Sequence, residues 1–449
     1  MPKRFTRRDF IHTAAGAAGF MAASKAIALP SPDYLQQWAA NTGEKIRFGI
    51  IGVGMQGSGL LASAVQLPGV ECIAACDLWD GRHTLAKEIA GPKIAVTRRY
   101  QDLLDNKDIA ALIVAVPDHW HKKIVVDAVT AGKDVYCEKP MSHTVADGAA
   151  MVAAVKKSGR ILQIGSQRTS SAILAKAKQI FDQGALGELL SIELTLGRND
   201  PSGAWEYPPP PGLSPENFDW DTWLGSAPKK AFDPITFARW RCWKEYGTGV
   251  AGDLMVHLVS GMMFVTGMNQ APSRAFATGG IVRWKDGRNM PDLHTSIFEY
   301  GSVPAYVRLT QGTETPELTR LLGSKGIMEI RGGDFTFTPQ RGIDTSPSYY
   351  SRSFPTEIRT AYEEQWHKEH DPAPGQGFVG EAVSYSGPSK DDVKPHLWNF
   401  FEAVRSRKPV AQDAVFGHHA AAACHMANQA YFSKVPVKWD EASNTIKPA

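Results

Sequence analysis

Short apolar runs alternate with helical stretches in the first third of the chain. The apolar runs lie at 46–51, 70–76, 111–116, 135–137 and 161–164. Between them the periodicity is helical, for example at 85–90, 122–130 and 146–157. Strands buried on both faces of a parallel sheet are continuous apolar runs, and helices supply the crossovers between them. The pattern predicts an α/β domain with a doubly wound parallel sheet over 45–165.

The pattern changes after residue 165. Apolar and polar residues alternate near 189–196, 275–282, 295–299, 305–309 and 326–330, as in half-buried antiparallel strands. This predicts an α+β domain over 166–435 with an open, mainly antiparallel sheet, closed by two helices near 392–406 and 414–432. Two segments interrupt it and are expected to be irregular insertions, at 199–246 and 333–390. Residues 436–449 are expected to be a C-terminal tail.

The N-terminus carries the signature of an export signal. Arg7 and Arg8 precede an Ala/Gly-rich apolar run that ends near Ala28. The run is short for a stable membrane span and suits cleavage better. We therefore expect a twin-arginine signal peptide over 1–28, a linker over 29–44, contact with the twin-arginine (Tat) export machinery, and a periplasmic or otherwise exported location.

Charge and cysteine content exclude several classes of protein. Residues 1–28 carry five lysines and arginines and one aspartate, a charge of +4, so the rest of the chain is near −1 against a total of +3. A near-neutral surface argues against a nucleic-acid partner. The five cysteines form neither a disulfide framework nor a metal pattern. Three histidines near the C-terminus favour a packed helix over a metal site: His418, His419 and His425.

A glycine fingerprint follows the first predicted strand. It has the form Gly-x-Gly-x-x-Gly, and Asp77 ends the second strand 20 residues after its last glycine. Such a turn cradles a pyrophosphate at a helix N-terminus, and the acid meets the adenosine ribose. The expected cofactor is NAD; NADP is less favoured because a carboxylate repels a 2′-phosphate, although Arg82 lies nearby. The candidate cofactor-binding residues here are Gly52, Gly54, Met55, Gln56, Gly57 and Asp77.

Three further motifs carry polar side chains that suit chemistry. Pro117 to His121 and Glu138-Lys139-Pro140 each follow a predicted strand. Loops at the carboxyl ends of central strands face the cofactor crevice. Within Gly252 to His257, Asp253 and His257 are four residues apart, so a regular helix would place them on one face about 6 Å apart. An alcohol gives up a hydride readily only as its proton leaves, which requires a base and a cation at one hydroxyl.

Together with the fingerprint, these motifs resemble the glucose–fructose oxidoreductase, inositol dehydrogenase and rhizopine catabolism family (Gfo/Idh/MocA), in its twin-arginine-exported branch. The resemblance covers about residues 45–435. It implies hydride transfer at a sugar-like carbinol carbon. It also implies that Lys139 polarises the reacting hydroxyl, His257 exchanges its proton, and Asp253 orients the substrate or His257. Further cofactor contacts are expected from Pro117, His121, Glu138 and Lys139.

Substrate contacts are less sharply defined. His121 could touch substrate or cofactor, or cap the next helix. Arg168, after the last strand of the first domain, could bind a hydroxyl or a carboxylate, or form an ion pair between domains. For Trp240 and Trp243, a carbohydrate platform over the pocket and an arm that packs on a partner subunit are equally favoured. For the other aromatic residues of the first insertion, an arm that packs on a partner subunit is slightly favoured: Trp205, Tyr207, Trp220, Trp223 and Tyr246.

The expected function is therefore an NAD-dependent oxidoreductase with a tightly bound cofactor, acting on a sugar or glycoside. One alternative is a redox-neutral enzyme that oxidises, eliminates and re-reduces, and so cleaves a glycoside. The exported glycosidases of this type carry a Tyr-x-x-His motif, and Tyr246 lies too far before His257 to match it. A second alternative is a non-catalytic sugar- or NAD-binding protein. The broad open sheet leads us to expect a homodimer or homotetramer.

Overall fold

The computed structural model describes residues 45–340, 347, 349–370, 381–387 and 392–449. The predicted signal peptide and linker lie outside these residues. The first sheet has six parallel strands in the order β3-β2-β1-β4-β5-β6, which confirms the predicted doubly wound sheet. The strands are β1 (Ile46–Ile51), β2 (Val70–Cys76), β3 (Ala95–Thr97), β4 (Ala111–Val114), β5 (Asp134–Glu138) and β6 (Leu162–Gly165).

Helices cover both faces of this sheet. The central strands β4 and β5 are therefore buried at every position. The crossover helices are α3 (Met55–Ala64), α4 (Asp80–Ala90), α5 (Tyr100–Asp105), α6 (Asp118–Thr130) and α7 (Val145–Ser158). One covering helix comes from far along the chain. In α13 (Val393–Ser406), Leu397, Phe400 and Phe401 pack into the same core as Phe48 of β1. The first domain thus includes a helix that the sequence analysis placed in the second.

The second domain is a ten-stranded sheet in the order β14-β13-β12-β11-β7-β10-β9-β8-β15-β16. Only the central β7–β10 pair is parallel among the described pairs, so the predicted open, mainly antiparallel sheet is confirmed. The strands are β7 (Leu189–Gly197), β8 (Arg274–Gly280), β9 (Leu293–Tyr300), β10 (Val303–Thr310), β11 (Thr315–Gly323), β12 (Gly326–Arg331), β13 (Asp334–Pro339), β14 (Val383–Ser386), β15 (Val437–Asp440) and β16 (Thr445–Pro448).

Both edges of this sheet correct the sequence prediction. β13 and β14 fall inside the segment expected to be an irregular insertion, and β15–β16 form a hairpin in the expected tail. Phe335 and Phe337 alternate inward along β13, as a half-buried strand requires. The strands are short and the intervening chain is polar, so their alternation was easy to overlook.

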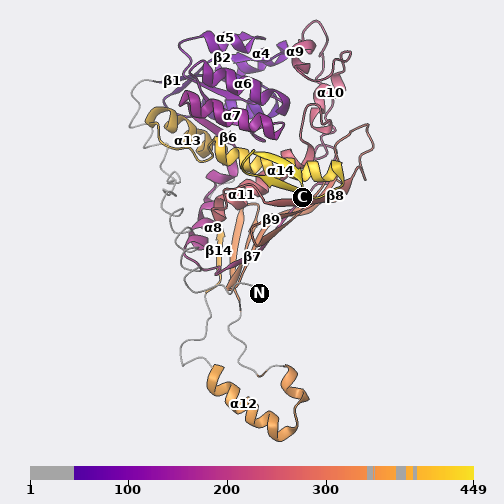
Figure 1. Ribbon diagram of the computed structural model, residues 1–449. Coiled ribbons are helices and arrows are strands. Elements are labelled where there is room, and N and C mark those ends of the chain that lie inside the picture. The colour runs from indigo at the N-terminus through magenta and orange to yellow at the C-terminus, as the bar shows by residue number, and fades with distance from the viewer. Residues whose placement is uncertain (1–44, 341–346, 348, 371–380, 388–391) are drawn as a thin grey trace.

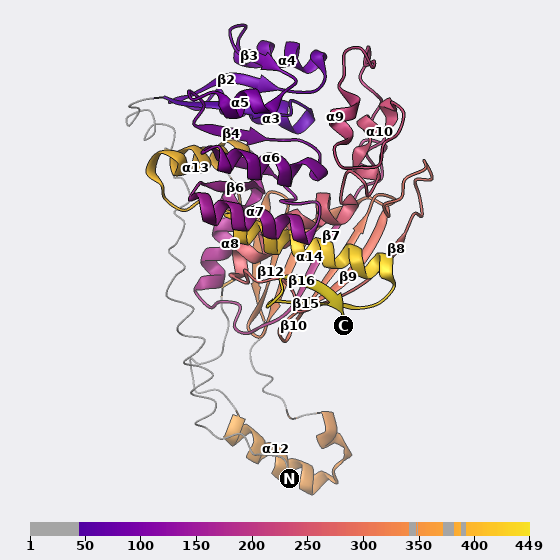
Figure 2. The same cartoon turned by 45° about the horizontal axis from the view of Figure 1, so that its top comes forward.

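Helices fill the space between the two sheets. α14 (Ala414–Ser433) packs against α7 of the first domain and β8 of the second, and lies between the domains in Figures 1 and 2. Its run of small residues, Ala420 to Ala423, is fully buried and allows this close approach. α11 (Val256–Thr266) packs beside it, and α8 (Ala172–Asp182) packs on α11. None of the helices in the described ranges is both long and apolar enough to cross a bilayer.

The first insertion folds onto its own chain. It contains α9 (Trp220–Leu224), α10 (Pro234–Ala238) and the short 3-10 helix η2 (Trp240–Cys242), and stands beside the first domain in Figure 2. Its aromatic residues form a small core of their own, with Trp220 and Trp223 stacked at 4.9 Å. Trp205 instead enters the core of the second domain. The expected arm toward a partner subunit is therefore corrected for these residues, because they are buried within one chain. In the second insertion, α12 (Thr356–His370) projects from the sheet (Figure 1).

Four buried histidines predict how stability depends on pH. Burial lowers the pKa of His119, His294 and His396 to about 4, and that of His425 to about 3. In the unfolded chain each returns to about 6.5, so unfolding takes up protons between these values. The free energy of unfolding should be highest above pH 6.5, where these histidines are neutral in both states. It should fall at lower pH, by roughly 1–2 kcal/mol per histidine at pH 5. Urea unfolding at pH 7 and pH 5 measures the difference; equal values would contradict it.

Candidate functional site

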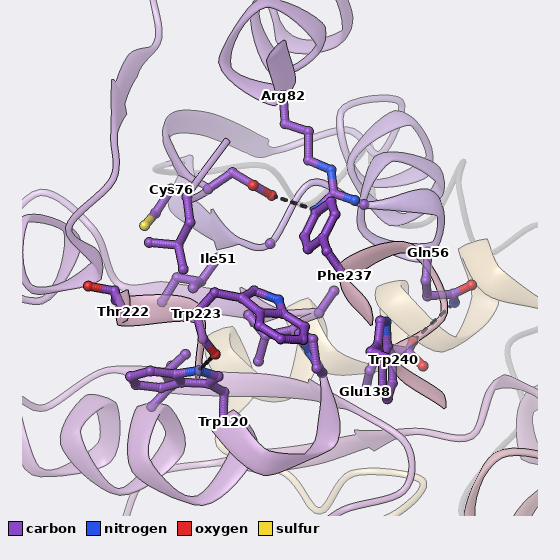
Figure 3. A pocket seen from close by; sticks show the side chains of 18 of the residues that line it. Ile51, Gln56, Cys76, Arg82, Trp120, Glu138, Thr222, Trp223, Phe237 and Trp240 are labelled. Carbon is purple, nitrogen blue, oxygen red and sulfur yellow. Dashed lines mark hydrogen bonds and ion pairs between the residues drawn. The ribbon is translucent and has the colours of Figure 1, made fainter. Parts of the chain in front are cut away.

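A single cavity of about 760 Å³ runs along the carboxyl edge of the parallel sheet. At one end it is lined by the glycine loop and Asp77, and at the other by Lys139 and Asp253. Aromatic residues of the first insertion line a further side (Figure 3). Its volume lies within the roughly 300–1,000 Å³ usual for ligand sites. Motifs that are far apart in the sequence therefore line one cavity.

The glycine loop is shaped to bring backbone close to a ligand. Gly52 has φ of +90°, and an added Cβ would lie 2.5 Å from the carbonyl oxygen of Ala115. A Cβ on Gly57 would lie 2.0 Å from the Gly52 carbonyl oxygen, so this glycine serves the turn and does not line the cavity. A Cβ added at Gly54 would lie 3.3 Å from the nearest atom, which belongs to the Arg82 guanidinium. The loop thus leaves an open cradle at the N-terminus of α3, which fits a pyrophosphate.

Asp77 is held at the end of β2 by the loop itself. Its Oδ2 accepts a hydrogen bond from the Val53 amide at 2.8 Å, and its Oδ1 accepts one from the Trp79 amide at 3.0 Å. Arg82 Nη1 lies 3.4 Å from Oδ2. The carboxylate still borders the cavity, where it can accept hydrogen bonds from ribose hydroxyls.

Glu138 closes the cavity floor between the two ends. Its Oε1 accepts hydrogen bonds from Gln56 Nε2 at 3.1 Å and from Gln167 Nε2 at 2.6 Å. Burial raises the pKa of this carboxyl. The residue therefore ties the fingerprint helix to the last strands of the sheet, and Met55, Gln56 and Pro117 line the space above it.

Lys139 and Asp253 form a buried ion pair at the inner end. Lys139 Nζ donates to Asp253 Oδ1 at 2.8 Å and to the Asp253 carbonyl oxygen at 2.9 Å. Arg241 Nε donates to the same Oδ1 at 3.0 Å, and its guanidinium lies 4.3 Å from the centroid of the Trp240 ring. Burial opposes ionisation of Asp253, but the two cations hold its pKa well below its usual range. Asp253 is a permanent anion that fixes Lys139 and Arg241, and a poor proton acceptor.

The segment that carries Asp253 is a π-helical turn, η3 (Ala251–Met255), and not the regular helix that the spacing predicted. π-turns inside helices are frequent at functional sites. His257 follows in α11, half-buried, with Nδ1 buried and lacking a hydrogen-bond partner among the described residues. Burial and the charges of Lys139 and Arg168 lower its pKa well below the usual range, so the ring is neutral. His257 interacts electrostatically with the Lys139–Asp253 pair but does not line the cavity.

Three other candidates lie away from the cavity. His121 is buried, and its ring nitrogens face the carbonyl oxygens of Pro140 and Val116 at 2.8 and 2.9 Å. Arg168 forms an ion pair with Glu317 of β11, so of its two predicted roles the structure shows an ion pair and no contact with the cavity. Trp243 packs against the hydrophobic cores. Trp240 alone of the predicted substrate residues lines the cavity.

The structure also adds residues that sequence reasoning missed. Arg241, Tyr207, Phe218 and Phe237 line the cavity. A single arginine between Trp240 and Trp243 was a usable signal, because a cation among aromatic residues is often buried and paired. The C-terminal histidines have other partners: His418 faces Asn444 and His425 faces Ser142. Within the described residues no cluster of three or more His, Cys, Asp or Glu could hold a metal ion.

The first domain matches a known family of oxidoreductases. Residues 46–166 match the family model GFO_IDH_MocA, described as an oxidoreductase family with an NAD-binding Rossmann fold. The first domain is thus similar to the NAD-binding domain that this family model describes. The inositol 2-dehydrogenase of Salmonella typhimurium is 34% identical over 149 residues, which are 33% of this chain and 44% of that protein. The levoglucosan dehydrogenase of Pseudarthrobacter phenanthrenivorans is 26% identical over 40% of this chain and 39% of that protein. The matches thus span less than half of these relatives' lengths.

Solved structures extend the likeness to the whole fold. A levoglucosan dehydrogenase in complex with NADH and levoglucosan aligns with a TM-score of 0.63 at 18% identity, over 88% of this chain and 99% of that one. The WlbA dehydrogenase from Bordetella pertussis, in complex with NADH and UDP-GlcNAcA, gives 0.64 at 18% identity, over 89% and 99%. An aldose–aldose oxidoreductase from Caulobacter crescentus gives 0.63 at 18% identity, over 88% and 100%. These likenesses establish the two-domain fold.

The π-turn generates a prediction about stability. A Cβ on Gly252 would lie 1.7 Å from Oγ1 of Thr248, whose hydroxyl donates to buried Asp118 at 2.6 Å. Gly252→Ala should therefore displace the turn and lower the free energy of unfolding by roughly 1–3 kcal/mol. The matched control is Gly261→Ala in α11, where the nearest atom to the added Cβ is Leu174 Cδ1 at 3.4 Å. Urea unfolding of both variants measures the effect; equal losses would contradict the account.

Proposed function

We propose that the protein is an NAD-dependent oxidoreductase that transfers a hydride between its cofactor and a hydroxyl carbon of a sugar or glycoside. One observation carries the proposal: the glycine cradle with Asp77 and the Lys139–Asp253 pair border the same cavity. A dinucleotide that places its pyrophosphate at the cradle extends toward that pair. The relatives named inositol 2-dehydrogenase and levoglucosan dehydrogenase support a polyhydroxylated substrate.

The side chains at the inner end divide the work. Lys139 spends two Nζ hydrogen bonds on Asp253 and keeps a third donor for the reacting hydroxyl oxygen, where it stabilises negative charge. Asp253 positions that ammonium group. His257 is neutral but does not line the cavity, so it exchanges the hydroxyl proton through Lys139: Lys139 passes a proton to His257 in oxidation and takes it back in reduction. NAD, when bound, supplies the hydride acceptor and donor.

Asp77 supports NAD as the resident dinucleotide. Its carboxylate borders the cavity beside the cradle and would repel a 2′-phosphate. Arg82 lies beside it, but its guanidinium is shared between the Asp77 carboxylate and the Phe237 ring. A 2′-phosphate would have to displace both contacts, so NADP is the less favoured cofactor.

Removing the Lys139 ammonium tests the assignment. Lys139→Ala should slow single-turnover reduction of enzyme-bound NAD by a panel of sugars and glycosides by roughly 100-fold or more, because proton and charge management at the hydroxyl is lost. NADH binding, followed by nicotinamide fluorescence, should persist. Lys157→Ala, at the exposed end of α7, is the control. Unchanged rates in Lys139→Ala would contradict the role. If the wild-type protein binds the dinucleotide but no sugar reduces its bound NAD, the result would favour the non-catalytic alternative.

We also propose that the enzyme is exported through the twin-arginine pathway. The support is the sequence at Arg7 and Arg8 with the apolar run behind it. Replacing both with lysine should retain the full-length precursor in the cytoplasm, as seen by fractionation and immunoblotting. Lys25→Arg, inside the same leader, should be exported as the wild type is. Export of the twin-lysine variant at the wild-type level would contradict the proposal.

A further inference from the structure

The first insertion carries a group of cavity-lining aromatic residues, here called the aromatic roof: Phe218, Trp223, Phe237 and Trp240. We propose that this roof retains NAD(H), so that the cofactor stays bound from one turnover to the next. The inference rests on the proposed function for the cofactor's identity. It assigns the insertion to the cofactor, whereas its aromatic residues suggested a sugar platform or a subunit contact.

One side of the roof is attached to the loop after β2. Phe218 forms a β-bridge with Trp79, the Asp219 amide donates to the Leu78 carbonyl oxygen at 3.1 Å, and the Asp80 amide donates to Asn217 at 3.1 Å. These are backbone contacts within three residues of Asp77, the candidate ribose ligand. The roof therefore begins directly over the adenosine end of the cavity.

The other side is attached to the start of α6. The Trp223 carbonyl oxygen accepts a hydrogen bond from Trp120 Nε1 at 2.9 Å (Figure 3). His119 Nε2 lies 2.9 Å from the same oxygen. The loop after β2 and the start of α6 stand on opposite sides of β1, because the strand order is β2-β1-β4 and α6 follows β4. The roof thus spans the crevice above the end of β1, where the glycine loop begins.

The underside of the roof touches the fingerprint side chains. The Phe237 ring centroid lies 5.0 Å from Arg82 Cζ (Figure 3). Arg82 in turn forms an ion pair with Asp77, and a Cβ added at Gly54 would lie 3.3 Å from its guanidinium. Inside the roof, the rings of Phe218 and Phe237 are 4.6 Å apart and the cluster is buried. A dinucleotide lying between cradle and roof is covered on one side by this packed cluster, which should slow its dissociation.

Retention constrains the overall reaction. A first sugar gives a hydride to the bound cofactor and a proton to the protein, and leaves oxidised by two electrons as a carbonyl compound. The reduced cofactor must then give the hydride, with a proton, to a second carbonyl compound that enters the same site and leaves as an alcohol. The reaction is redox-neutral and needs no soluble NAD. A second sugar that accepts the hydride satisfies this balance. So does an oxidised sugar intermediate that has undergone elimination and then takes the hydride back.

The dissociation rate of NADH from the whole mature protein tests the roof. Protein loaded with NADH is mixed with excess NAD, and the loss of bound-NADH fluorescence is followed for the wild type, Trp223→Ala and Phe237→Ala. Both variants should release NADH at least roughly tenfold faster, since changes in a binding surface act mainly on dissociation. The control is Trp366→Ala, which removes a tryptophan from α12, and this helix lies far from the parallel sheet (Figure 1). Equal release rates in all four proteins would overturn the proposal.

Hydrogen–deuterium exchange of the wild type gives a second readout that does not depend on either variant folding. Adding NADH should slow exchange of amides in 217–224 and 234–240, while those of α12 stay unchanged. Unchanged exchange in the roof would overturn the proposal. Neither measurement involves a sugar, so a protein that retains NADH but never oxidises a sugar refutes the proposed function and leaves the roof in place.

Discussion

Asp253 accepts hydrogen bonds from two cations that belong to different parts of the chain. Lys139 comes from the end of the parallel sheet, Arg241 from the first insertion, and Asp253 itself from the π-turn of the second domain. All three are largely withdrawn from water, with side-chain exposures between 12% and 19%. A buried carboxylate without partners is costly, so the arrangement holds only if all three segments are in place. The site is thus assembled by the same contact that fixes the domains and the insertion together.

The division of acid–base roles follows from that contact. A carboxylate shared by two cations stays ionised and cannot take a proton at neutral pH, which leaves it a positioning role. Burial and the charges of Lys139 and Arg168 lower the pKa of His257, so its ring is neutral and has a free nitrogen lone pair that can take a proton. The pKa values of these two groups, four residues apart, are both lowered, and Lys139 contributes to both shifts. Perturbed pKa values of this kind are common at functional sites.

Sequence reasoning succeeded where the signal is local. The glycine fingerprint, Asp77 and Glu138-Lys139-Pro140 lie at strand ends, and strand ends of a parallel sheet share one edge, so their convergence was predictable. It failed where the outcome depends on tertiary contacts. Arg241 joins the site because an insertion without regular pattern folds back over the crevice. The segment that carries Asp253 is a π-turn instead of a regular helix, and in this turn Gly252 packs closely on Thr248. His121 has its polar atoms taken up by backbone carbonyls, which no spacing rule reveals.

The position of the insertion also explains why cofactor and substrate can behave differently at one site. The roof is attached on both sides of the adenosine half of the crevice, at Leu78 and at Trp120. At the inner end the cavity is bordered by Tyr207, Trp240 and Arg241 beside Lys139. A ligand held at its adenosine end is therefore restrained by backbone hydrogen bonds and packed rings, whereas one that occupies only the inner end touches side chains. Slow exchange of the dinucleotide and fast exchange of a sugar are compatible in this geometry, which a redox-neutral cycle requires.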